Sequence, residues 1–96
     1  MRVAEIIGKV TLSRTHPSLQ GSRWVIGVPL TADGIAKLST GRGEPLVIYD
    51  ELGAHSGALV AFSEGAEAVA PFHPDVKPLD AYSSALIDRI VVDPVD

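Results

Sequence analysis

Apolar residues recur at every second position near the start of the chain. From residue 2 to residue 12 the even-numbered apolar and glycine positions are Ala4, Ile6, Gly8, Val10 and Leu12. This period of two predicts a β-strand that turns one face toward a core, and the glycine inside it predicts a bend or a β-bulge. The opposite face mixes apolar and charged side chains, as we expect if part of it meets another subunit.

Four further segments have the composition of strands, with valine, isoleucine, leucine and aromatic residues in the majority. They lie at 22–30, 47–49, 59–62 and 85–92. The last of them, Ala85 to Val92, is apolar on both faces, which is typical of a central strand or of a strand in an interface. A short helical turn is expected near Leu79–Tyr82, directly after Pro78.

The residues between these segments decide the fold class. Five short strands joined by turns that contain glycine and proline predict a mainly β protein, a small, partly open, five-stranded OB-like β-barrel. The stretch from Ser63 to Pro78 contains two further prolines, Pro71 and Pro74, which exclude a long helix and a central strand there. We expect a long surface excursion in this stretch, and a single domain over residues 1–96.

The composition leaves more apolar surface than one small core can bury. Of the 96 residues, 46% are hydrophobic, whereas a chain of this length buries only somewhat over ~60% of the surface that its unfolded form exposes. Surplus apolar surface is usually buried in contacts between subunits. A monomer with an apolar surface is the alternative.

Charge and residue usage exclude several classes of partner. A net charge of −4 with only 8 Lys and Arg provides no basic face for nucleic acid. Glu5 and Lys9 interrupt the apolar stretch at the N-terminus, so no signal peptide is expected, and no segment approaches the ~20 apolar residues that cross a bilayer. The absence of cysteine excludes disulfides and thiolate metal sites. We therefore expect a cytoplasmic protein with no membrane or nucleic-acid partner.

Two glycines four residues apart bracket a short loop between the third and fourth predicted strands. Gly53 and Gly57 enclose Ala54, His55 and Ser56, and glycine adopts positive φ without steric cost, so the chain can reverse here. A nucleophile elbow differs, because its serine lies midway between two glycines and leads into a helix. We therefore expect the loop to act through its shape, as a packed or rim-lining element.

No set of residues has the spacing of a metal or phosphate site. The histidines are His16, His55 and His73. They share no ligand spacing and are interpreted as separate surface residues. The acidic pair Asp50 and Glu51 is interpreted as solvated charge, whereas Asp88 interrupts an apolar strand and would need a hydrogen-bonding partner if buried. The sequence thus predicts no metal, no cofactor and no catalytic residue.

Four short motifs, taken in their order and spacing, resemble one protein family. They are Pro17-Ser18-Leu19-Gln20-Gly21, the segment from Asp50 to Val60, Pro78-Leu79-Asp80-Ala81, and Ile87-Asp88. With the strand before them, they are similar to the Leu-x-Gly-type turn, the Asp-x-x-Gly-Ala-Gly-x-Gly segment, the Pro-Val-Asp-Ala motif and the Ile-Val-Asp motif of the EutN/CcmL family. Three positions depart from the family pattern. His55 replaces a glycine, Ala66-Glu67-Ala68-Val69 replaces Ser-Ser-Ala-Arg, and Thr15 replaces a lysine.

The resemblance implies an assembly and a set of partners. The EutN/CcmL proteins are pentameric vertex proteins of bacterial microcompartment shells, so the chain is expected to be a structural protein, not an enzyme, whose homopentamer caps the vertices of such a shell. Its implied partners are further copies of itself, the hexameric shell proteins and encapsulated enzymes. Its implied location is the shell of a microcompartment in the bacterial cytoplasm.

The same resemblance implies where the functional surfaces lie. The loop expected to line a narrow fivefold pore, or to lie near its axis, comprises Gly53, Ala54, His55, Ser56 and Gly57. The residues expected at the subunit interface are Val3, Ile7, Asp80, Ile87, Asp88 and Ile90. Two alternatives stay open, an OB-like adaptor for a peptide or single-stranded nucleic acid, and a small enzyme.

Overall fold

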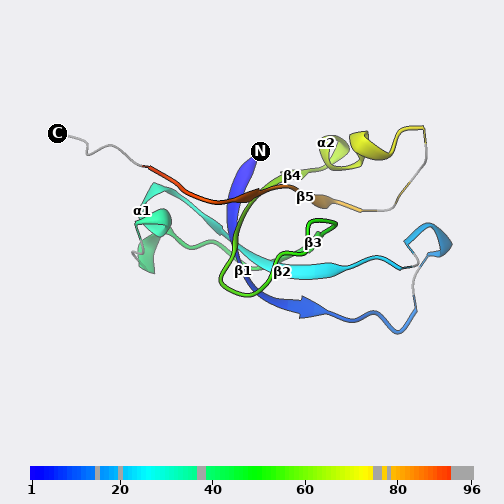
Figure 1. The fold of residues 1–96 in the computed structure, drawn as a ribbon, viewed down its shortest axis with the longest axis horizontal. Coiled ribbons are helices and arrows are strands. Elements are labelled where there is room, and N and C mark those ends of the chain that lie inside the picture. The colour runs from blue at the N-terminus through cyan, green and yellow to red at the C-terminus, as the bar shows by residue number, and fades with distance from the viewer. Residues whose placement is uncertain (15, 20, 37–38, 75–76, 78, 92–96) are drawn as a thin grey trace.

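Five β-strands form a closed barrel (Figure 1). The computed structural model describes the chain except for residues 15, 20, 37–38, 75–76, 78 and 92–96, so the expectations for Thr15, Pro78 and Val92 lie outside the described residues. The strands are β1 (Arg2–Val10), β2 (Trp24–Leu30), β3 (Leu46–Tyr49), β4 (Leu59–Glu64) and β5 (Ala81–Ile87). Around the barrel they follow the order β1-β2-β3-β5-β4. The predicted mainly β fold with a small five-stranded barrel is confirmed.

Short helical segments occupy the connections between the strands. They are the 3-10 helices η1 (Pro17–Leu19), η2 (Ser39–Gly41) and η3 (Ala70–Phe72) and the α-helices α1 (Ala32–Ile35) and α2 (Ala66–Val69). α2 and η3 lie in the stretch that we expected to be a surface excursion. Pro71 falls in the first turn of η3, where the missing N–H of proline costs no helical hydrogen bond. Pro71 is therefore compatible with a helix that begins here, although it would break a longer helix that continued through it.

The position of the last strand corrects the boundaries expected from the sequence. β5 spans Ala81–Ile87, so the helical turn expected near Leu79–Tyr82 is wrong, and the strand begins before Ala85. Ser83 is buried and lies directly opposite Phe62 of β4. A serine that faces a buried aromatic ring has no apolar signature in the sequence, which explains why the strand was expected to start later.

The barrel closes through a single residue pair. β1 pairs with β2 and β4, β2 with β3, and β4 with β5, all in antiparallel orientation. β3 and β5 run parallel and pair only at Tyr49 and Tyr82. In the described part of the chain, the remaining residues along the facing edges of β3 and β5 have no ladder partner. The partly open barrel expected from the sequence is therefore wrong, since this seam between β3 and β5 closes the barrel, although with the shortest ladder.

Gly8 lies at an irregularity of β1, as predicted. The register with β2 shifts between Ile6 and Gly8, which makes Ile7 the extra residue of a β-bulge. Ile6 is buried before the shift, whereas Val10 is only partly buried after it. β1 also pairs with β4 only as far as Glu5. Beyond the bulge, β1 therefore keeps β2 as its ladder partner but no longer pairs with β4, while this part of β2 still pairs with β3.

A cluster of eight buried residues fills the barrel. It consists of Ala4, Ile6, Val25, Ile48, Ala54, Val60, Phe62 and Ala81. Gly27 of β2 is buried against this core, and a Cβ atom there would lie 2.6 Å from Cδ1 of Ile48 and 3.2 Å from Cβ of Ala4. Protein interiors are packed about as densely as organic crystals, and here position 27 has room only for a hydrogen.

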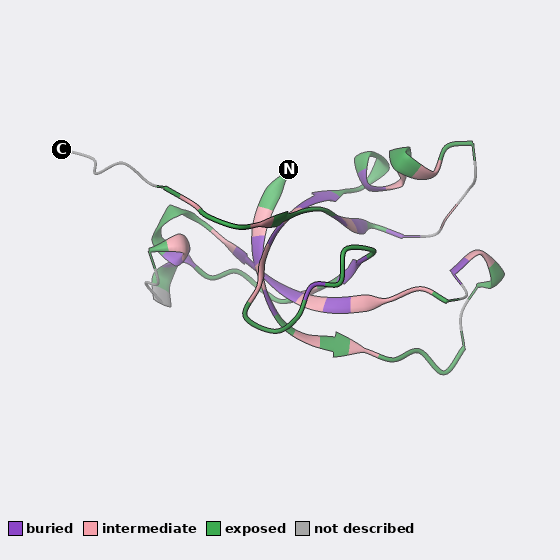
Figure 2. Ribbon diagram, in the orientation of Figure 1, coloured by how far each residue is buried: buried purple, intermediate pink, exposed green. Residues whose placement is uncertain are grey.

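A second apolar cluster covers one end of the barrel (Figure 2). It combines the buried Leu19, Tyr49, Ala68 and Leu79 with the partly buried Trp24, Val69, Phe72 and Tyr82. The ring centroid of Tyr49 lies 5.2 Å from that of Trp24, 5.5 Å from that of Phe72 and 6.0 Å from that of Tyr82. These separations are typical of favourable aromatic pairs. The cluster thus packs η1, α2 and η3 onto the strands.

Candidate functional site

Asp50 fixes the loop between β3 and β4. It directly follows β3, and its side chain is 0% exposed. Its carboxylate accepts hydrogen bonds from the backbone N–H groups of Leu52, Gly53 and Ala54, with N···O distances of 3.2, 3.0 and 2.9 Å. Three donors around one carboxylate meet the requirement of a buried charge for hydrogen bonds. The interpretation of Asp50 as a solvated charge is therefore wrong.

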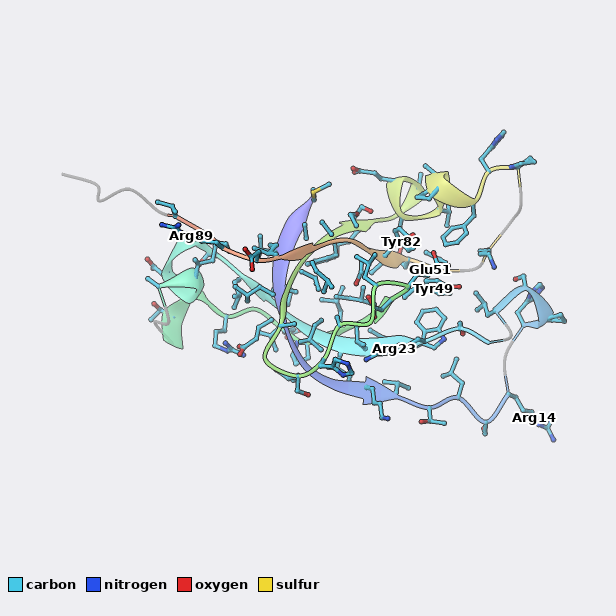
Figure 3. The ribbon with its side chains drawn as sticks, viewed as in Figure 1. Arg14, Arg23, Tyr49, Glu51, Tyr82 and Arg89 are labelled. Atoms are coloured by element: carbon cyan, nitrogen blue, oxygen red, sulfur yellow. The ribbon has the colours of Figure 1, made fainter. Side chains whose placement is uncertain are left out.

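Arg23, the residue directly before β2, holds the same loop. Its Nε atom lies 3.7 Å from Oδ2 of Asp50, and its guanidinium donates a hydrogen bond to the carbonyl of Ala54. Ala54 is itself buried in the barrel core. In Figure 3, Arg23 lies close to the labelled Tyr49 and Glu51, where β3 passes into the loop. The loop is therefore held by an ion pair, by side-chain hydrogen bonds and by a residue inserted in the core.

Backbone geometry explains both glycines of the loop. Gly53 has a φ of 78° and Gly57 a φ of 92°, a region in which any other L-residue is strained. The N–H of Gly57 donates to the carbonyl of Ile6 at 2.7 Å, which ties the second half of the loop to β1. His55 and Ser56 between them are exposed. Of the five residues expected near an axis, the alanine points into the core and the other four are exposed to solvent.

An open groove of about 850 Å³ runs beside this loop. Its lining comes from the end of β1 and the residues after it, from the start of β2, and from the loop; the residues are 8–12, 19, 21–24 and 54–56. Val10, Leu12 and Trp24 give the groove an apolar wall, while Lys9 and His55 bring basic groups to it. No carboxylate lines the groove among the described residues. It therefore suits an apolar segment that carries negative charge.

The residues expected at a subunit interface fall into two groups. Val3 and Ile7 belong to β1, and the group around β5 comprises Asp80, Ile87, Asp88 and Ile90. β4 lies between β1 and β5 in the barrel, so one chain does not bring the two groups together. Ile7 is 46% exposed. Asp88 is exposed too, so its carboxylate does not need a buried partner.

Tyr82 and Glu51 link β5 to the loop (Figure 3). The Tyr82 hydroxyl donates to Oε1 of Glu51 at 2.8 Å. Burial, then the hydrogen bond to Glu51 and the negative charge of that residue, together raise the pKa of Tyr82 to about 12. Burial also raises the pKa of Tyr49, with the charge of Glu51 as a second cause. Folding therefore keeps both phenols protonated at a pH at which they would ionise in an unfolded chain.

The raised pKa of Tyr82 predicts a loss of stability in alkali. Its contribution is fully present below pH 10 and is lost as the pH rises toward 12. A rise of this size corresponds to at most about 2.7 kcal/mol, and we expect about 1 kcal/mol because the phenol is partly solvated. Urea unfolding between pH 8 and 11.5 measures the change. The Tyr82→Phe variant should lose less stability over this range than the wild type, and an equal loss in both proteins would contradict the assignment.

The described residues contain no group of three His, Cys, Asp or Glu side chains that could hold a metal ion. His16 instead closes the turn at η1, where its Nδ1 lies 2.7 Å from Oγ of Ser18 and accepts the N–H of Ser18 at 3.1 Å. In the same part of the chain, no helix has the length and apolar character needed to cross a membrane.

Solved structures with the same fold provide the first comparison. CcmL of Gloeobacter violaceus is 26% identical, with 97% of this chain and 91% of that chain covered at a TM-score of 0.82. GrpN, a pentameric microcompartment shell protein from Rhodospirillum rubrum, is also 26% identical, with 97% and 100% covered at a TM-score of 0.78. EutN of Escherichia coli is 20% identical, with 96% and 89% covered at a TM-score of 0.79, and supports the fold alone.

Comparison of the sequence with known proteins and families provides the second comparison. No curated protein matches the chain significantly. The family model described as ethanolamine utilisation protein EutN/carboxysome matches residues 1–88. This match spans the whole barrel, including the loop between β3 and β4, and the residue after β5. The chain therefore belongs to the EutN/CcmL family.

Proposed function

We propose that this protein is a structural shell protein whose homopentamer caps the vertices of a bacterial microcompartment shell. The observation that carries the proposal is the likeness to GrpN, a pentameric microcompartment shell protein, over 97% of this chain and 100% of that chain. The surface agrees with self-association, since Ile7, Leu12 and Leu86 are each more than 40% exposed in the single chain. Burial of such residues favours contact between subunits.

The finer parts of the proposal concern the partners and the axis. Hexameric shell proteins would surround each pentamer, encapsulated enzymes would lie inside the shell, and the particle would lie in the bacterial cytoplasm. We further propose that the 53–57 loop lies next to the fivefold axis. Support comes from its rigidity, since Asp50, Arg23 and Ile6 all bond to it, and from its exposed tip at His55 and Ser56.

The native mass tests the assembly. The chain weighs 10.1 kDa, so a closed ring of five would weigh about 50 kDa. We expect this species to dominate in native mass spectrometry and in light scattering at neutral pH. A monomer or dimer under the same conditions would contradict the proposal and favour a binding adaptor.

Disulfide cross-linking of a His55→Cys variant tests the position of the loop. The chain contains no cysteine, so every disulfide would involve the new thiols. Disulfides need Cα atoms within about 7 Å, a separation that only a position close to the axis provides between neighbouring copies. We expect mild oxidation to produce disulfide-linked dimers inside an intact ring. A matched Glu44→Cys variant, which is exposed on another loop, should stay uncrosslinked; equal behaviour of the two would place the 53–57 loop away from the axis.

A further inference from the structure

We infer that residues 86–91 of one copy dock into the groove beside the 53–57 loop of the next copy. The inference rests on the proposed homopentamer and names the two surfaces that meet in it. A cyclic ring with an odd number of subunits needs two different, complementary surfaces on each copy. The groove and the 86–91 segment meet this requirement.

The 86–91 segment is apolar and uncovered within one chain. Leu86 is 47% exposed and Val91 is 69% exposed, while Ile87 and Ile90 are only partly buried. Leu86 lies directly opposite Val60, which is 0% exposed. Residues paired in this way project from the same face of a sheet, so Leu86 continues the core face of β4 to a place where the chain provides no cover.

The strand that leads into this segment also has a free edge. β5 pairs with β3 only at Tyr82, so on that side the residues from Ser83 to Ile87 have no ladder partner in the described part of the chain. Unpaired strand edges tend to acquire a partner from another chain. Both the side chains and the backbone edge of this region thus favour contact with a second copy.

The groove offers surface of matching character. Leu12 is 43% exposed, and Val10 and Trp24 are partly exposed beside it. The ion pair with Asp50 neutralises Arg23, so Lys9 and His55 remain as the basic groups of the lining. The incoming segment carries two exposed charges, Asp88 and Arg89, and of these the Asp88 carboxylate complements Lys9 and His55. Opposite charges at the edge of an apolar contact fix its register and its partner.

The two surfaces belong to different ends of the molecule. In Figure 1 the chain leaves β5 toward the C-terminus on one side, while the connection from β1 to β2 extends on the other. Arg89 and Arg14, labelled in Figure 3, mark these two ends. The segment therefore does not reach the groove of its own chain. Each copy instead offers its segment to one neighbour and its groove to the other.

Aspartate substitutions at equally exposed leucines test the pairing. Leu12→Asp damages the groove and Leu86→Asp damages the segment; Val91→Asp is a second segment variant that is more exposed and less demanding for folding. Each variant alone is expected to lose the ring of about 50 kDa and to migrate near the mass of one chain. Val47→Asp is the matched control, because Val47 is 46% exposed and lines neither surface. The control should keep the ring.

A mixture of the groove variant and a segment variant provides the decisive measurement. The intact segment of the Leu12→Asp chain can enter the intact groove of the Leu86→Asp chain, while the remaining groove and segment are both damaged. We therefore expect a 1:1 heterodimer of about 20 kDa and no ring. Circular dichroism confirms that each variant is folded.

The outcomes separate the two proposals. A wild-type ring that persists in the Leu12→Asp and Leu86→Asp variants would overturn the docking and leave the pentamer standing. Loss of the ring in the Val47→Asp control alone would assign the contact to the outer face of β3 and would also overturn the docking. A wild-type monomer would overturn the proposed pentamer itself.

Discussion

The Asp50→Ala variant is expected to lose about 3–5 kcal/mol of its free energy of unfolding, the cost of removing one partner from a buried ion pair. Without the carboxylate, the N–H groups of Leu52, Gly53 and Ala54 lose their acceptor, and Arg23 loses its counter-ion. Each buried donor that stays unsatisfied costs about 1–3 kcal/mol. Urea unfolding at pH 7, followed by tryptophan fluorescence of Trp24, measures the loss.

Three variants place the effect at the carboxylate. Asp50→Asn keeps one acceptor oxygen but turns an N–H₂ group toward backbone donors, so an intermediate loss is expected. Arg23→Ala leaves the three N–H bonds intact and should cost less than Asp50→Ala. Glu44→Ala, in an exposed position, should change stability by less than about 0.5 kcal/mol. If Asp50→Ala behaved like Glu44→Ala, the loop would not depend on this carboxylate.

The Gly41→Ala variant is expected to lose about 2–3 kcal/mol, a typical cost of forcing extra volume into a packed site. A Cβ atom at Gly41 would lie 2.5 Å from the carbonyl carbon of Asp33 and 2.5 Å from Cα of Gly34. Both neighbours are backbone atoms, which cannot turn away as a side chain can. The carbonyl of Gly41 also accepts the N–H of Thr31 at 2.9 Å, so a shift of η2 would break this bond as well.

Gly43→Ala is the matched control for this prediction. It lies two residues further along, and the nearest atoms to its Cβ would be Cβ and O of Pro29, both at 3.6 Å, an ordinary van der Waals distance. Urea midpoints of the two variants should therefore differ clearly, with Gly43→Ala close to the wild type. Equal midpoints would show that α1 and η2 separate at little cost.

Local patterns in the sequence were sufficient for most of the barrel. The alternation from Ala4 to Val10 predicts β1, and Gly8 predicts its bulge, because both signals come from residues close together in the chain. The start of β5 could not be predicted in the same way. Ser83 is buried only because Phe62, 21 positions earlier, lies opposite it, and no local periodicity contains that fact.

The sequence predicted the position of the loop between β3 and β4, but not the hydrogen bonds and the ion pair that hold it. The glycines at 53 and 57 indicated the loop, and their positive φ values confirm why they are there. The role of Asp50 was missed because its partner Arg23 lies 27 positions earlier. One local signal existed, an aspartate that directly follows an apolar strand and precedes a glycine by three positions, a pattern in which the side chain bonds nearby backbone N–H groups.

The seam between β3 and β5 has a mechanical consequence. The other ladders contain four to seven residue pairs, whereas a single pair joins Tyr49 to Tyr82. Local opening costs least where the fewest interactions must break, so the barrel widens at this seam before any other place. β3 leads into the loop that contains residues 53–57, and β5 leads into residues 86–91. Widening of the seam therefore changes the angle between these two regions. In the proposed pentamer, the curvature of the ring can thus be adjusted by bending inside each subunit, while the contacts between subunits are kept.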